Sequence, residues 1–288
     1  MDAHEILDDF IDLYRNNTIS IYDYMEGYEP GPGEATYLDQ HKHNYILTLD
    51  DVEALRKKLG KSPEDMHVLE IGPFLGVVSL TLAKMGYKIT LIEIEEYLSS
   101  KSVTALYDEL GIQYHSVNLR EYDLPFEDNT FDVILCCEVL EHLNFNPIPV
   151  LAEFNRVLAM GGFMYLAVPN LASLNHRLNL LRGGSIHYPV SAFFDHALKP
   201  GNPVGIHWRE YNHSEARELL TGTGFTIEKQ YLFDPIDTMD DETLKLRQKL
   251  RKRFLQWKPS WKRFLTTIGR KTQSLDFEFH LTGAKSAR

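Results

Sequence analysis

The sequence predicts an α/β fold built on a doubly wound parallel sheet. Apolar runs typical of strands alternate with amphipathic, helix-like segments from residue 66 onward, and a glycine-containing turn follows the first run. Such alternation implies parallel strands joined by right-handed crossovers, with ligands bound at the carboxyl ends of the strands. The length of 288 residues suits one large α/β domain with additions, or two small domains.

The element boundaries follow from periodicity and from helix-breaking residues. Strands are expected at 66–71, 88–93, 112–117, 131–137 and 162–168, with one more opening at Gly224-Phe225 and a last one at 276–283. Helices are expected at 4–24, 48–59, 76–86, 96–110, 147–159 and 213–222. The helix at 48–59 has apolar residues at helical spacing and ends at Gly60.

Composition and charge set broad limits on function. The chain is 43% hydrophobic and 25% charged, and its formal net charge of -11 argues against a general nucleic-acid binder. Adjacent Cys136 and Cys137 should point to opposite faces of a strand, so no disulfide between them is expected, and a reducing, cytoplasmic setting fits. We expect neither a signal peptide nor a membrane span, because no long apolar stretch is present.

The most informative segment is the turn after the first strand, which carries Gly72 and Gly76. Glycine there permits positive φ and close approach of a ligand, and Glu93 ends the next strand, where a carboxylate can accept hydrogen bonds from two ribose hydroxyls. The alternative is a simple packing turn. Phe74 weakens the nucleoside interpretation because its Cβ restricts the turn.

Later segments resemble the class I S-adenosylmethionine (SAM) dependent methyltransferases over about residues 66–230. The segments that carry the resemblance are Leu124-Pro125-Phe126, Phe131-Asp132, Glu138-Val139-Leu140-Glu141-His142-Leu143, Arg156-Val157-Leu158 and Gly161-Gly162. The resemblance implies a SAM-dependent enzyme with a Rossmann-like, seven-stranded sheet whose last strand is antiparallel. A dinucleotide dehydrogenase is disfavoured, because the G-x-G-x-x-G pattern is absent.

The resemblance also assigns the cofactor site. It implies that Glu93 binds the ribose and that Glu138 lies in the segment that passes the methionine moiety. The other positions that it implies are Glu70, Gly72 and Gly76 on the methionine and ribose side, and Asn118 with Leu119 near the adenine. From their places in the sequence, Ile94 is expected to offer an apolar face to the purine, and the Phe74 ring to help close the site. Two positions depart from the family pattern, Phe74 for Gly and Asn118 for Asp.

A hydroxyl acceptor needs a base near the methyl group. The candidates are His142, which follows the fourth strand, and His196 and His207 in the segment 170–212. Each can instead be a structural or surface histidine. Asp195-His196 with His207 matches no spacing of metal ligands, so no metal site is expected.

Residues 170–212 interrupt the alternation and are interpreted as a cap that selects the acceptor. The candidate substrate residues are Arg177, Tyr188, Trp208 and Tyr211. Aromatic faces with polar side chains suit a sugar or glycan, and a small metabolite is the alternative.

The chain is expected to divide into an N-terminal helical extension (1–60) and a methyltransferase domain (61–288).

Residues 244–271 are basic and amphipathic and contain no acid. They are expected to be helical, as part of an insertion (240–272) before the last strand. They predict either peripheral contact with an anionic membrane or a hairpin packed on the sheet. Two further functions stay open: a SAM-binding partner subunit without turnover, and a tRNA or protein methyltransferase.

Overall fold

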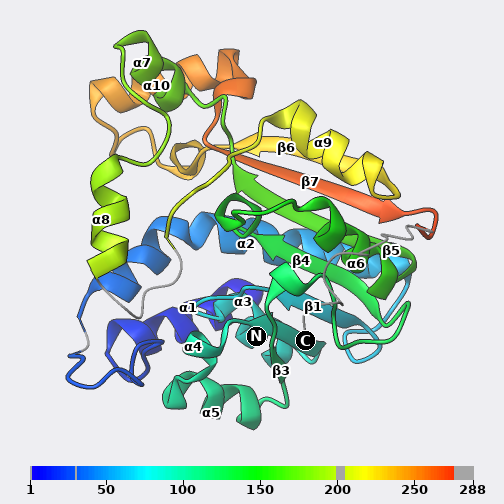
Figure 1. Cartoon of the computed structure of the whole chain (residues 1–288). Coiled ribbons are helices and arrows are strands. Elements are labelled where there is room, and N and C mark those ends of the chain that lie inside the picture. Colours follow the sequence, from blue (N-terminus) through cyan, green and yellow to red (C-terminus); the bar gives the residue numbers. More distant parts are fainter. Residues whose placement is uncertain (1, 30, 199–204, 276–288) are drawn as a thin grey trace.

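The computed structural model describes residues 2–29, 31–198 and 205–275, without the side chains of residues 195–198. Its centre is a seven-stranded sheet with the order β3-β2-β1-β4-β5-β7-β6 (Figure 1). The strands are β1 (His67–Ile71), β2 (Lys88–Glu93), β3 (Gln113–Ser116), β4 (Phe131–Cys137), β5 (Leu158–Pro169), β6 (Phe225–Phe233) and β7 (Phe264–Lys271). Strands β1 to β5 pair in parallel, and β7 is antiparallel to both of its neighbours, which confirms the predicted fold class.

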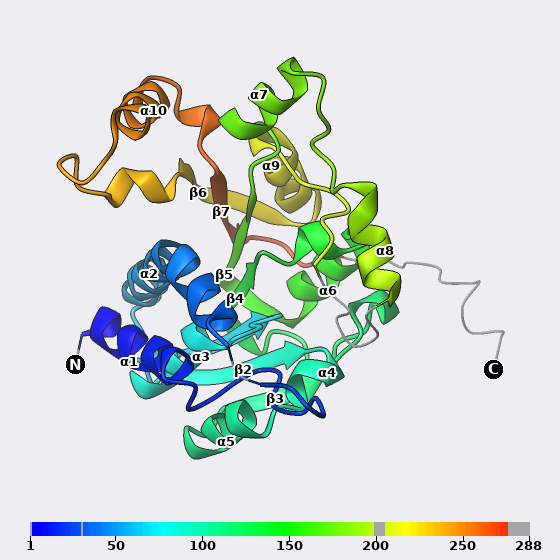
Figure 2. The same cartoon turned by 90° about the vertical axis from the view of Figure 1, so that its left-hand side faces the viewer.

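Helices cover both faces of the sheet (Figure 2). They are α1 (Ala3–Arg15), α2 (Gly33–Leu59), α3 (Val77–Lys84), α4 (Glu95–Leu98), α5 (Lys101–Glu109), α6 (Ile148–Val157), α7 (Leu174–Leu181), α8 (Val190–Leu198), α9 (His213–Gly222) and α10 (Leu246–Trp257). Helices α1, α2, α3 and α5 share one buried cluster with the sheet, and α6 and α9 share the cluster on the other face.

The strands have near-continuous apolar sequences because both of their faces are buried. In β4, Val133 and Leu135 face the cluster of α1 and α2, whereas Ile134 and Cys136 face that of α6 and α9. Cys137 packs on the face opposite to Cys136, and both cysteines are free, as expected. Among the described residues, no helix combines the length and apolar composition that a membrane crossing needs.

Two helix predictions were wrong in extent. The helix expected over 4–24 ends at Arg15, because Asn17 has a left-handed φ of 53° and the Thr18 amide returns to the Leu13 carbonyl. The helix expected from residue 48 begins at Gly33. Its first half is polar, so the spacing of apolar residues that indicates a helix is not recognisable there. The segment expected as one helix at 96–110 divides into α4 and α5, with Ser100 capping α5.

The basic segment 244–271 is helical in α10 and in a short 3₁₀ turn (Pro259–Trp261), but residues 264–271 form β7. This strand is apolar and rich in β-branched residues, and flanking basic residues mask it in the sequence. Its Lys271 is buried, and Nζ donates to the carbonyls of Asn155 and Leu158 at 2.6 and 2.7 Å. The strand expected at 276–283 lies outside the described residues, and β7 is the antiparallel strand of the sheet.

The turn between β1 and α3 depends on two glycines with left-handed backbone. Gly72 has a φ of 60° and Gly76 a φ of 68°. A Cβ at Gly76 would overlap the hydroxyl of buried Tyr107, and a Cβ at Gly72 would lie 2.9 Å from Val139 Cγ2. Both conformation and packing therefore require glycine here.

We predict that Gly76→Ala lowers the free energy of unfolding by about 2–4 kcal/mol, because it adds an overlap with Tyr107 to the cost of positive φ. Gly60→Ala is the matched control: Gly60 has a φ of 67° with open space around its Cβ position, so about 1 kcal/mol is expected. Denaturant unfolding measures both. An equal decrease in the free energy of unfolding in the two variants would contradict the proposed overlap between the added Cβ and Tyr107.

Candidate functional site

A cavity of about 1410 Å³ lies at the carboxyl ends of the parallel strands. It is lined by the turn after β1, the ends of β2 and β4, the segment after β3, the cap, and the start of β7. The N-terminal extension adds Tyr22, Tyr37 and His41 to the wall. The cavity therefore has the location expected for a ligand of this fold.

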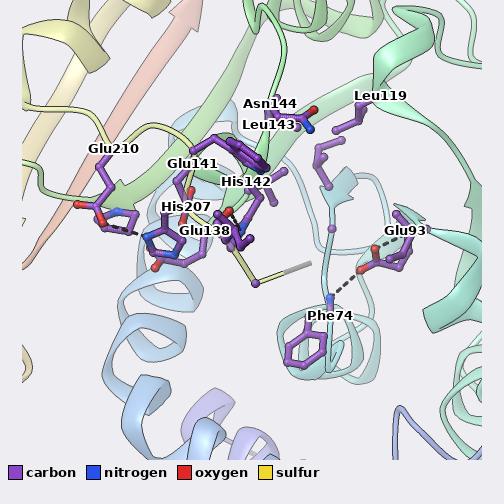
Figure 3. Close-up of a pocket in the computed structure, with 18 of the residues that line it drawn as sticks. Phe74, Glu93, Leu119, Glu138, Glu141, His142, Leu143, Asn144, His207 and Glu210 are labelled. Atoms are coloured by element: carbon purple, nitrogen blue, oxygen red, sulfur yellow. Dashed lines mark hydrogen bonds and ion pairs between the residues drawn. The ribbon is translucent and has the colours of Figure 1, made fainter. Parts of the chain in front are cut away.

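Glu93 is the central polar group at one end of the cavity (Figure 3). Its carboxylate accepts hydrogen bonds from the backbone amides of Phe74 and Ile94 at 2.9 and 2.8 Å. Burial raises the pKa of this carboxyl to about 7. A carboxylate has about four acceptor positions, so two remain for the adjacent hydroxyls of a ribose.

Phe74 has a left-handed φ of 52°, which turns its amide toward Glu93. Its ring points away from that carboxylate (Figure 3) and packs edge-on or tilted against Tyr37 and Tyr97, with centroids 5.4 and 5.1 Å apart. Tyr22 completes this group of rings. Phe74, which weakens the nucleoside interpretation at the level of sequence, is thus part of an aromatic wall.

Asn118, Leu119 and Ile94 line the same end of the cavity. The Asn118 side chain caps the 3₁₀ turn at Leu119–Glu121 and accepts the Arg120 amide at 3.1 Å. One acceptor position of its oxygen and the amide donors remain available. These groups suit the polar edge and the apolar faces of a purine.

Four predicted site residues lie outside the cavity wall. Glu70 is buried beneath the turn, and the Ser79 hydroxyl donates to it. Gly76 packs on Tyr107. Tyr211 is buried in the core beside α9, and Arg177 lies over the Trp261 ring and donates to the Ala172 carbonyl.

The other end of the cavity carries a second polar group of residues: Glu138, Glu141, His142 and His207. Glu138 follows β4 with a left-handed φ of 55°, a strained conformation that is common at functional sites. The Trp208 amide donates to the Glu141 carbonyl at 2.7 Å, so the cap docks on the turn Leu140–His142. Tyr188 and Trp208 also line this end, and the side chain of His196 lies outside the described residues.

Burial controls the charges of this group of residues. It raises the pKa of Glu138 to about 8 and, together with Glu138 itself, the pKa of Glu141. Burial and the neighbouring His207 lower the pKa of His142 to about 4. His142 is therefore a neutral imidazole near pH 7.

Sequence reasoning missed several wall residues. Glu141 belongs to the segment Glu138–Leu143 that carries the family resemblance, and its spacing of three from Glu138 and its place beside His142 are the sequence signals that mark it as a wall residue. Glu210 lies behind His207 (Figure 3). No sequence signal marked Tyr22, Tyr37 or Arg263, because they reach the cavity from segments far away in the chain.

The fold and this site define a nucleoside-binding α/β domain. Residues 69–166 match the family described as "Methyltransferase domain". They form a methyltransferase domain of the SAM-dependent class I family, and its cofactor is SAM.

Curated relatives are similar over part of their length. A ubiquinone biosynthesis O-methyltransferase of Colwellia psychrerythraea is 28% identical over 160 residues, which are 55% of this chain and 61% of that protein. One of Parvibaculum lavamentivorans is 33% identical over 108 residues, 37% of this chain and 42% of that protein. The chain thus spans less than two thirds of the length of these relatives.

Solved structures share the fold at low identity. One is a complex of the Haloferax volcanii Trm112 methyltransferase activator and a protein assigned as a methyltransferase, with a TM-score of 0.54, 15% identity, and coverage of 92% of this chain and 98% of that chain. Another is assigned as a sarcosine dimethylglycine methyltransferase of Galdieria sulphuraria, with a TM-score of 0.51, 16% identity, and coverage of 92% and 98%.

We predict that Glu93→Ala weakens SAM binding about 100-fold, because two hydrogen bonds to a charged, buried group are lost. Glu96→Ala is the matched control, since Glu96 also borders the cavity but is exposed, and its affinity should stay within about threefold. Calorimetric titration with SAM measures both. Similar affinities for Glu93→Ala and the parent chain would refute the ribose assignment.

Proposed function

We propose that this chain transfers a methyl group from SAM to an oxygen of a small-molecule acceptor. One observation carries the proposal: Glu93 and the second polar group of residues occupy opposite ends of one cavity. A ribose bound at Glu93 directs the rest of the cofactor along the turn at Gly72 toward Glu138. The acceptor then enters from the side of the cap.

In this proposal, the residues at each end of the cavity have a different role. The bound cofactor supplies an electrophilic methyl group on a positively charged sulfur. Glu93 holds the ribose, and the aromatic wall around Phe74 keeps water from the cofactor. The Nε2 atoms of His142 and His207 are free for the acceptor end, because Nδ1 of each donates elsewhere, to the Ile206 carbonyl at 3.2 Å and to Glu210 at 2.9 Å.

Two observations support an oxygen acceptor on a ring. Relatives of this chain are named ubiquinone biosynthesis O-methyltransferases. The cap lines the cavity with the aromatic side chains of Tyr188, Phe193 and Trp208, which suit the face of a sugar or of an aromatic ring. We therefore propose a hydroxyl-bearing ring compound, with a sugar or glycan as the finer hypothesis.

The competing functions are weaker. A SAM-binding subunit without turnover needs no buried polar group at the far end of the cavity. A tRNA methyltransferase needs a broad basic surface, whereas the chain has a net charge of -11.

The test is transfer of a radiolabelled methyl group from SAM to representative acceptors: phenols and catechols, free sugars, and lipid-linked sugars. We expect label in at least one ring-hydroxyl class, and a loss with Glu93→Ala at limiting SAM because binding is weakened. SAM binding without transfer to any acceptor would favour the subunit without turnover.

We also propose that α10 makes peripheral contact with an anionic membrane. Leu246, Leu250 and Trp257 share one face of this helix and are 71%, 57% and 71% exposed. Exposed Arg247 and Arg253 flank that face. The helix lies at the periphery of the molecule in both views (Figures 1 and 2), and Arg251 ties it to Asn175 of the cap. Apolar residues bordered by arginine are typical of helices that lie in a membrane interface.

We predict that the parent chain sediments with phosphatidylglycerol vesicles at low salt and not with phosphatidylcholine vesicles. Replacing Leu246 and Trp257 together by Ser should lower the vesicle partition coefficient about 100-fold, because their side chains no longer bury apolar area in lipid. Met160→Ser is the control, since Met160 is 56% exposed at the other end of the sheet. Absence of vesicle binding by the parent chain refutes the proposal.

A further inference from the structure

Three potential metal ligands converge at the cap end of the cavity. Glu141, His142 and His207 each offer one ligand atom, and these atoms lie within 4.8 Å of one another. Glu141 and His142 lie in the turn after β4, whereas His207 comes from the cap, 65 residues later. The rings of the two histidines meet edge-on, with centroids 4.9 Å apart.

Both histidines are oriented in the way that metal ligands usually are. Nδ1 of His142 donates to the Ile206 carbonyl, and Nδ1 of His207 donates to the Glu210 carboxylate (Figure 3). These bonds fix the tautomer and leave Nε2 of each ring with a free lone pair. A carboxylate behind a histidine is the common supporting arrangement for a metal-binding imidazole.

The Glu141 side chain is buried without a hydrogen-bond partner in another described residue. The residue is 0% exposed, and neither carboxylate oxygen accepts a hydrogen bond from another described residue. Burying an unpaired carboxylate is costly, and each unpaired buried polar group in a native protein needs an explanation. A hydroxyl acceptor could donate to one oxygen, but it would leave both imidazole lone pairs unused.

The charges around this group of ligands also favour a cation. Glu138 and Glu210 contribute further carboxyl groups to the cavity wall beside Glu141. Arg120 and Arg263 are the arginines of the cavity wall. A divalent ion can bind directly to the unpartnered oxygens of Glu141.

We propose that Glu141, His142 and His207 bind a divalent transition-metal ion, such as Zn²⁺, Co²⁺ or Mn²⁺, with its open positions facing the cavity. Imidazole ligands favour these ions over Mg²⁺ and Ca²⁺, which prefer all-oxygen sites. Two histidines and one carboxylate with a position left open form a set typical of catalytic rather than structural sites. The sequence shows no typical spacing of metal ligands, because His207 is distant from Glu141 in the chain and comes close to it only in the folded structure.

The role of the ion rests on the function proposed above. The ion coordinates the hydroxyl oxygen of the acceptor, which places that oxygen at the end of the cavity where the transferable methyl group is expected. Coordination would also acidify the hydroxyl, which loses its proton to water; the oxygen then bonds to the methyl carbon as the carbon–sulfur bond of SAM breaks and S-adenosylhomocysteine leaves as a neutral thioether. Metal binding itself does not depend on methyl transfer, so the two hypotheses can fail separately.

The test uses the full chain, stripped with a chelator and dialysed against Co²⁺ or Zn²⁺. We expect one equivalent of tightly bound metal and a visible Co²⁺ absorption band typical of nitrogen and oxygen ligands. Glu141→Gln and His207→Asn should each weaken binding at least about tenfold, because a direct ligand is lost. His41→Gln is the control, since His41 lines the same cavity away from these ligands and should retain the metal.

The outcomes separate the hypotheses. Melting curves check that each variant is folded, and a metal-free parent chain should still bind SAM through Glu93. No bound metal in the parent chain, or equal binding in Glu141→Gln, His207→Asn and His41→Gln, overturns the site. Metal bound as expected but methyl transfer unaffected by its removal overturns the role of the ion. A metal-loaded chain that binds SAM and transfers no methyl group refutes the proposed function while the site stands.

Discussion

The hydrogen bond from the Phe74 amide to the Glu93 carboxylate is the interaction on which the cofactor end of the cavity depends. It joins the turn after β1 to the end of β2 and holds Phe74 in a left-handed conformation. The Tyr14 hydroxyl donates to the Leu75 carbonyl at 2.6 Å, so α1 fixes the same turn from behind. One carboxylate thereby fixes the turn after β1 and directs the Phe74 ring into the aromatic wall.

The cap end depends on a different constraint, the docking of the segment around His207 onto the turn after β4. Backbone bonds from Trp208 and Arg209 to the Glu141 carbonyl join the two segments. The Nδ1 atom of His142 donates to the Ile206 carbonyl. Two of these three contacts join backbone atoms only, so the position of His207 depends mainly on the path of the chain and on the His142 side chain.

The sequence was sufficient for what depends on local pattern. The boundaries of β2 and β4, the positive φ of Gly72 and the place of Glu93 followed from periodicity, turn chemistry and order along the chain. It was insufficient where distant segments meet. The basic residues on both sides of β7 make its sequence resemble a basic amphipathic helix, so the strand was not predicted. Tyr37 reaches the cavity from the N-terminal extension, and no residue near it in the sequence indicates a binding site. Glu70, which the family resemblance places at the cofactor, lies beneath the turn and accepts a hydrogen bond from the Ser79 hydroxyl, a contact that no local pattern predicts.

The two ends of the cavity show why burial alone does not define a role for a carboxylate. Glu93 and Glu141 are both buried glutamates that follow parallel strands. Two backbone amides donate to Glu93, so its charge is already supported and its remaining acceptor positions suit neutral hydroxyls. Glu141 receives no donor from another described residue and lies beside two imidazoles with free lone pairs. The two carboxyl groups therefore differ in their partners: backbone amides satisfy Glu93, whereas the nearest potential partners of Glu141 are two imidazole rings.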